Sequence, residues 1–123
     1  MQPRSDQPAT AQEVVQNLSA LTEELRRTVS AFRAAERDAA MKRHAADMAE
    51  SRAFLSADGA MDLRKHVARV AADQAEGEAL VAEALVRVLR AEIRAIETRI
   101  EVGRTYGATV RAELRTLGLD GAA

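Results

Sequence analysis

The chain has 123 residues, with no cysteine, no tryptophan, only three other aromatic residues and a formal net charge of −1. The absence of cysteine excludes disulfides, thiolate nucleophiles and thiolate metal sites, and the even mixture of charges argues against a basic nucleic-acid arm or an acidic tail. The first residues lack the apolar segment of a signal peptide, and charges interrupt every apolar run well short of the roughly 18 residues that span a bilayer. We therefore expect a soluble, cytoplasmic protein that does not associate with membranes.

The N-terminal half predicts a short tail followed by one long helix. Pro3 and Pro8 are the only prolines, so we expect residues 1–10 to form a flexible tail. Thr10 and Glu13 have the spacing of a capping box, which places the start of helix 1 at residue 11. Helical periodicity then continues to about residue 55, with small or apolar side chains at Leu18, Leu21, Leu25, Val29, Phe32, Ala35, Ala39, Ala46, Ala49 and Ala53.

A single turn signal separates this segment from a second long helix. Asp58 and Gly59 favour a chain reversal, which we place at residues 56–60, and either of them can cap the next helix. Helix 2 is expected from about residue 60 to residue 117, and Gly118 is placed to terminate it. Residues 119–123 would then form a C-terminal tail.

These elements predict an all-α protein with one domain, a long antiparallel two-helix hairpin over residues 11–118 that resembles a coiled coil. Pairing about the turn makes the numbers of facing residues sum to about 117. Leu18 then faces Ile100, and Phe32 faces Leu85. Near the turn both helices present alanines, so the helices should approach each other more closely there.

Helix 2 has more apolar surface than helix 1 can cover, which predicts self-association into a homo-oligomer. Its apolar residues between 80 and 89 span too much of the helix circumference for one partner. Its C-terminal end also extends past helix 1, so that end should contact another subunit, a different protein or its own chain. The candidate interface residues are Val81, Leu85, Val88, Leu89, Gly103, Tyr106, Gly107, Val110, Leu114 and Leu117.

Three glycines leave alternatives open inside helix 2. Gly103 and Gly107 are four residues apart, which favours close helix packing, a bend that folds a third, C-terminal helix back on the chain, or, least of all, a ligand or phosphate site. Gly77 is either a break or a small residue facing Ala40 at a tight crossing. We expect helix 2 to be continuous through Gly77.

Few residues could support chemistry. His66 follows Asp62 by four residues and should approach Glu50, but such a set on an exposed helix lacks an enclosed cavity, so we expect no metal, no cofactor and no enzymatic activity. The arginines at 87, 90 and 94 form a basic ridge that could contact phosphates. Interspersed glutamates favour ion pairs within the helix instead, so nucleic-acid binding is the alternative here.

The segments 52–65 (RAFLSADGAMDLRK) and 94–107 (RAIETRIEVGRTYG) resemble small helical proteins encoded by tailed phages and prophages. The resemblance covers roughly residues 35–118. It implies a phage or prophage origin, and hence the host cytoplasm, often with a gene among early or recombination genes, but it implies no activity for any residue. We therefore expect a self-associating, non-enzymatic interaction or assembly protein, with a nucleic-acid-associated accessory role in replication or recombination as the alternative.

Overall fold

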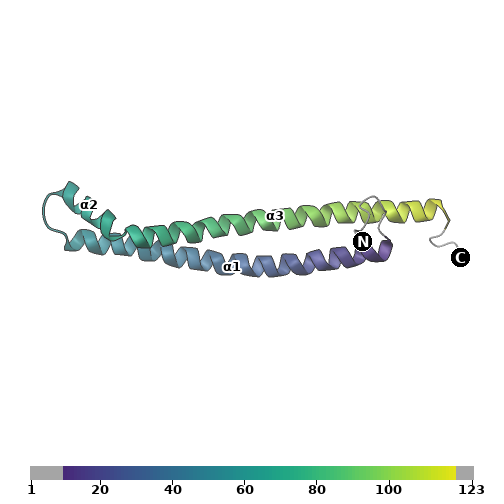
Figure 1. Cartoon of the computed structure of the whole chain (residues 1–123), viewed down its shortest axis with the longest axis horizontal. Coiled ribbons are helices and arrows are strands. Elements are labelled where there is room, and N and C mark those ends of the chain that lie inside the picture. The colour runs from purple at the N-terminus through teal and green to yellow at the C-terminus, as the bar shows by residue number, and fades with distance from the viewer. Residues whose placement is uncertain (1–9, 119–123) are drawn as a thin grey trace, which may run out of the picture. The chain divides into compact units, whose positions relative to one another are not determined.

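The computed structural model describes residues 10–118, which form helices and turns with no strand in that part of the chain (Figure 1). The helices are α1 (Ala11–Ser56), α2 (Met61–Ala71) and α3 (Asp73–Thr116). The all-α prediction is confirmed, and α1 and α3 pack against each other as a hairpin requires. The expected tails at residues 1–9 and 119–123 lie outside the described residues.

The chain divides into two compact units, each described by itself. One unit contains residues 28–92, with the turn, α2 and the adjoining parts of α1 and α3. The other contains, among the described residues, 10–27 from the N-terminal side and 93–118 from the C-terminal side. One domain over residues 11–118 stays a prediction.

The capping box forms as predicted at the start of α1. The backbone N–H of Thr10 donates to the Glu13 carboxylate at 3.0 Å, and the N–H of Glu13 donates to the Thr10 hydroxyl at 3.1 Å. Two amides that the helix leaves without partners are thus satisfied reciprocally. Helix α1 begins at Ala11 for this reason.

The turn differs from its prediction in detail. Helix α1 continues one residue further than expected, to Ser56, and α2 begins at Met61. Gly59 has a φ of 106°, a left-handed conformation that L-residues with side chains rarely adopt. The residue preceding α2 is Ala60, which makes no side-chain cap, so neither Asp58 nor Gly59 is the N-cap.

Helix 2 is continuous through Gly77, as expected, because Gly77 lies inside α3. The expected single helix from residue 60 to residue 117 is wrong, because it is interrupted at Ala72. Ala72 has φ −92° and ψ 0°, yet its N–H donates to Ala68 and its carbonyl accepts from Glu76, so the interruption is confined to one residue. Acidic Asp73 and Glu76 occupy the first turn of α3, where the helix dipole favours negative charge. Arg69 occupies the last turn of α2, which the dipole favours equally. These charges stabilise a helix end and a new helix start at this point.

The unit of residues 28–92 has a core built from small side chains. Ala46, Ala68 and Ala79 are at most 1% exposed, and Ala72 and Ala82 are also buried. The closer approach of the helices that the alanines near the turn predict stays a prediction. Because each alanine buries little apolar area, this core contributes less to stability than a leucine seam of equal length.

The second unit buries larger side chains, Ile96, Ile100 and Val14. Its register differs from the expected one. A β-carbon added to Gly103 would lie 2.9 Å from Leu18 Cδ2, and one added to Gly107 would lie 3.0 Å from Val14 Cγ1. Facing residues therefore sum to 121, one helical turn away from the predicted 117. Apolar and small residues recur at helical spacing along α1 and α3, so a shift of one turn still brings them together, and the observed register places Leu18 and Val14 over the two glycines.

Helix α3 continues through Gly103 and Gly107 without interruption, so the alternative of a C-terminal third helix is wrong and the additional helix is α2. Gly118, with φ 71°, follows the helix, and its N–H donates to the Arg115 carbonyl at 3.0 Å. Its role as the terminating residue is confirmed.

Candidate interaction surface

Large apolar side chains on α3 remain exposed in the unit of residues 28–92. Val81 is 72% exposed, Val88 is 60% exposed and Leu85 is 49% exposed. Leu80 is exposed as well, whereas Leu89 is half-buried. Because these side chains remain exposed in a single chain, the excess of apolar surface that the sequence predicts on this helix is present.

The opposite flank of the same helix pair is occupied by an ion-pair network. The Arg43 guanidinium donates from Nε and Nη2 to the two carboxylate oxygens of Glu83, at 3.1 and 2.8 Å. Its Nη1 donates to Glu76 at 2.6 Å. One arginine of α1 therefore joins two carboxylates that are seven residues apart on α3, and these two ion pairs are the only ones between α1 and α3 that the described residues show.

This network shifts the pKa of two of its members, Glu83 and Arg43. The hydrogen bond from Arg43, helped by its positive charge, holds the pKa of the Glu83 carboxyl below the usual glutamate value. The same two carboxylates raise the pKa of Arg43 above its ordinary range. Glu83 and Arg43 are therefore both charged at neutral pH, and this flank of the helix pair is polar, with its charges already paired within the chain.

Helix α1 adds apolar surface on the flank away from Arg43. At about 100° per residue, positions two before and two after Arg43 project from the side of α1 opposite to its guanidinium. Met41 is 71% exposed, and Ala34 and Ala45 are exposed too. The uncovered flank therefore has apolar residues from both helices.

Helix α2 is amphipathic, but its apolar face points outward. Leu63 is 55% exposed, Val67 41% and Val70 63%, while Ala68 is its one buried residue. Arg64 holds the inner side: its guanidinium lies 4.3 Å from the centre of the Phe54 ring and donates to the Phe54 carbonyl at 3.1 Å. In an ordinary surface helix the leucine would be buried and the arginine exposed. Helix α2 has the reverse arrangement.

The exposed residues of α2 and α3 form one periodic series that sequence reasoning missed. Steps of three and four residues connect its members across the interruption at Ala72, as in a heptad repeat. We call this series the second seam; its positions are Leu63, Val67, Val70, Gln74, Gly77, Val81, Leu85 and Val88. The 3–4 spacing in the sequence could have indicated this series, but the predicted apolar excess covers only the residues from 80 onward.

Several predicted interface residues are used within the chain itself. Gly103 and Gly107 accommodate Leu18 and Val14 of α1, so the structure assigns them to close packing inside the hairpin. The residues around and beyond these glycines are in part accessible. Tyr106 is 39% exposed and Leu117 71% exposed, whereas Val110 and Leu114 are half-buried.

The arginines suggested as phosphate contacts are exposed, but two of them already have partners on the chain. The Arg90 guanidinium lies 5.5 Å from the Phe32 ring centre. Arg87 lies close enough to Glu83 to lower the pKa of that carboxyl, although less than Arg43 does. Arg94, in the other unit, is exposed as well.

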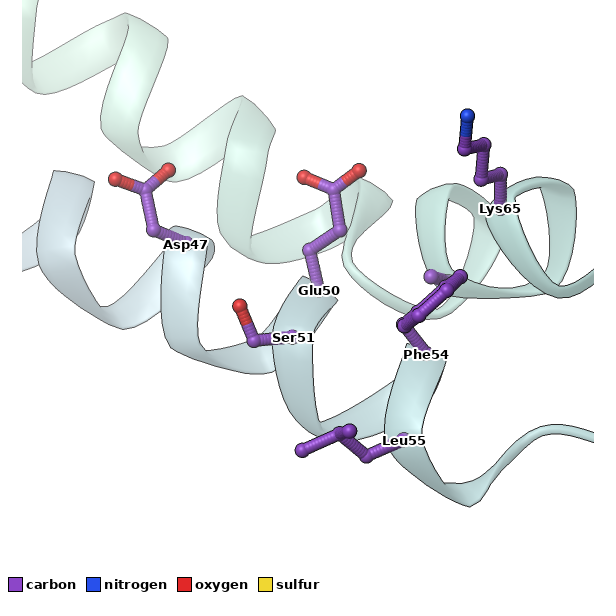
Figure 2. A pocket seen from close by; sticks show the side chains of 7 residues that line it. Asp47, Glu50, Ser51, Phe54, Leu55 and Lys65 are labelled. Carbon is purple, nitrogen blue, oxygen red and sulfur yellow. The ribbon is translucent and has the colours of Figure 1, made fainter. Parts of the chain in front are cut away.

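A surface hollow of about 550 Å³ lies between the end of α1 and α2. Figure 2 shows the carboxylates of Asp47 and Glu50 directed to one side of α1, the Phe54 ring directed toward α2, and the Lys65 ammonium turned away from the ring. The hollow is open to solvent, and its polar groups do not converge on one point. It therefore has none of the enclosure that small-molecule sites use.

Within residues 10–118 no three histidine or acidic side chains come close enough to hold a metal ion. The set suggested by His66, Asp62 and Glu50 is accordingly not assembled. Across the same residues no helix is long and apolar enough to cross a bilayer.

Comparisons of the chain with protein-family models, with curated proteins and with solved structures found no match. The resemblance to small phage and prophage proteins therefore stays a sequence-based expectation. Any functional argument depends on the surface of the molecule itself.

Proposed function

We propose that the protein is a non-enzymatic interaction or assembly protein that associates with further copies of itself through the exposed apolar residues of α3, and that it is of phage or prophage origin. The observation that carries the proposal is the contrast between the two flanks of α3. One flank is closed by the Arg43 network, and the other leaves Val81, Leu85 and Val88 exposed.

The free energy that burial of this apolar surface would contribute can be compared with the cost of association. Fully burying a valine or leucine stabilises by about 1.5–3 kcal/mol, so the exposed portions of these three side chains represent about 1–2 kcal/mol each. In a two-fold dimer each contributes twice, about 6–12 kcal/mol in all. Association itself costs about 4–15 kcal/mol. The three α3 residues therefore require additional buried area nearby for a stable dimer.

A second copy is the simplest partner for this surface. A two-fold axis brings the same patch of both copies together, so one sequence supplies both sides of the interface. Helical bundles bury apolar stripes of this kind by adding further helices to a hairpin. The polar flank bearing Arg43 would remain in solvent.

The concentration dependence of thermal unfolding tests the proposal. A self-associating protein melts at a higher temperature when its concentration is raised, because only the folded state associates. We expect this dependence in the wild type and its loss in the double variant Val81→Glu/Val88→Glu. Both valines are exposed in a single chain, so the variant should keep its helical circular dichroism.

Ala40→Glu provides the matched control. Ala40 is exposed on α1 near Arg43, and the substitution adds charge without touching the apolar flank. We expect this variant to keep the concentration dependence of the wild type. A wild-type melting temperature that is the same at micromolar and at hundredfold higher concentration would refute self-association.

We do not propose nucleic-acid binding. Arg87 and Arg90 lie beside Glu83 and Phe32 of their own chain, and phosphates would compete with these contacts. Duplex and single-stranded DNA in gel-shift assays at increasing salt remain the direct check, because binding through phosphates weakens steeply as salt rises.

A further inference from the structure

Charges beside the second seam are distributed unequally across the interruption at Ala72. Helix α2 contains three basic residues, Arg64, Lys65 and Arg69, and one acidic residue, Asp62. The following segment, residues 73–85, has four acidic side chains and no basic one. The second seam therefore runs from a basic helix into an acidic one.

We propose that two copies pair antiparallel about the α2–α3 junction, so that α2 of each copy packs on the first turns of the partner's α3. The proposal rests on the self-association proposed above and specifies its geometry. An antiparallel pair that is centred near residue 74 places each basic α2 beside the acidic segment of the other copy. A parallel pair would instead bring basic beside basic and acidic beside acidic.

The residue types along the seam fit this arrangement. With facing numbers that sum to about 148, Leu63 meets the partner's Leu85 and Val67 meets the partner's Val81. Val70 falls opposite the partner's Gly77, where a β-carbon would have nothing within 4 Å in the single chain. A glycine at that point gives Val70 room to approach the partner's backbone, which explains a glycine inside a helix that does not need one for its own packing.

The same register defines one ion pair on each side of the two-fold axis. Arg69 would face the partner's Glu78, and both side chains are exposed and take part in no ion pair within residues 10–118. Glu76 and Glu83, in contrast, are already held by Arg43. Asp73 and Glu78 are the acidic residues of this segment that are exposed and outside the Arg43 network, and Glu78 is the one that this register places opposite Arg69.

Complementary charge reversal tests the arrangement. We expect Arg69→Glu and Glu78→Arg each to raise the dissociation constant of the homodimer by about tenfold, because both copies of the pair become repulsive. Mixing the two variants should restore association to near the wild-type constant, since one copy of the pair is then reversed and the other is unchanged. Sedimentation equilibrium measures all three constants.

The mixture controls for effects on folding, because it contains the same two chains as the separate samples. Val67→Glu provides a second measurement, and it should abolish association as Val81→Glu/Val88→Glu does. A wild type that stays monomeric would overturn the proposed self-association itself. A wild type that associates and loses association in Val81→Glu/Val88→Glu, but keeps it in Arg69→Glu, Glu78→Arg and Val67→Glu, would overturn only the antiparallel geometry.

Discussion

Leu18 of α1 packs directly on Gly103 of α3, with its Cδ2 atom 2.9 Å from the place where a β-carbon on Gly103 would lie. One turn further along α3, Val14 stands in the same relation to Gly107 at 3.0 Å. Two large side chains of one helix thus fill the space left by two glycines of the other. This contact fixes the register of the hairpin in the unit that contains it.

Two glycines of α3, Gly77 and Gly103, should respond differently to alanine. Gly77→Ala meets open space and should raise the free energy of unfolding by about 1 kcal/mol, the helix propensity difference. Gly103→Ala gains the same propensity but must displace Leu18, so it should be about 1–3 kcal/mol less stable than Gly77→Ala. Urea denaturation measures both, at low protein concentration so that association does not contribute.

Repeating Gly103→Ala in a Leu18→Ala variant tests whether the Leu18 side chain causes the loss of stability. With the leucine side chain removed, Gly103→Ala should become stabilising, like Gly77→Ala. If Gly103→Ala stabilises the wild-type chain as much as Gly77→Ala does, Leu18 does not pack on Gly103 as described.

Cysteine cross-linking should report the register, because the chain has no native cysteine. The pair Val14→Cys/Gly107→Cys should form a disulfide readily, since these positions are in contact. The pair Val14→Cys/Gly103→Cys lies one turn, about 5.4 Å, out of register and should cross-link slowly. Faster oxidation of the second pair would support the register that sums to 117.

The sequence predicted the helical class, the capping box and the turn, because each depends on local spacing or on residues with strong conformational preferences. The register was not predictable in this way. The registers in which facing residues sum to 117 and to 121 differ by one helical turn. Choosing between them depends on how Leu18 and Val14 pack on the glycines of α3. The interruption at Ala72 was missed because alanine is a strong helix former, although the charges of Arg69 and Asp73 pointed to it.

The candidate surface was predictable in part. The sequence predicts the exposed residues from Val81 to Val88, because one partner helix cannot cover all the apolar residues of this segment. The outward apolar face of α2 could not be predicted in this way, because it depends on Arg64 packing inward against Phe54.

The Arg43–Glu83 pair should make stability depend on pH in the acidic range. Because the pKa of Glu83 is lowered in the folded state, its contribution is present above the unfolded value of about 4.5 and is lost as the pH falls through the folded value. Glu83→Gln should therefore lower the melting temperature at pH 7, and the difference from wild type should shrink below about pH 4.5. Glu50→Gln, which removes an exposed carboxylate outside the network, is the control and should show no such convergence.

Helix α2 should detach locally when Arg64 is truncated. Its attachment depends on the Arg64 contacts with Phe54 and on one buried residue, Ala68. We expect Arg64→Ala to speed hydrogen exchange of α2 amides by about tenfold and to leave α3 amides unchanged. Lys65→Ala removes an exposed basic side chain from the same helix and should have little effect. Equal exchange rates in the two variants would show that Arg64 does not anchor α2.

We propose that the protein associates with itself through the apolar face of α2 and α3. Its most direct test is the mass of the wild-type protein in solution by light scattering, from about 1 µM to about 100 µM. We expect a mass that rises with concentration from the monomer value of 13.3 kDa toward twice that value or beyond. A mass that stays at 13.3 kDa over the whole range would contradict it.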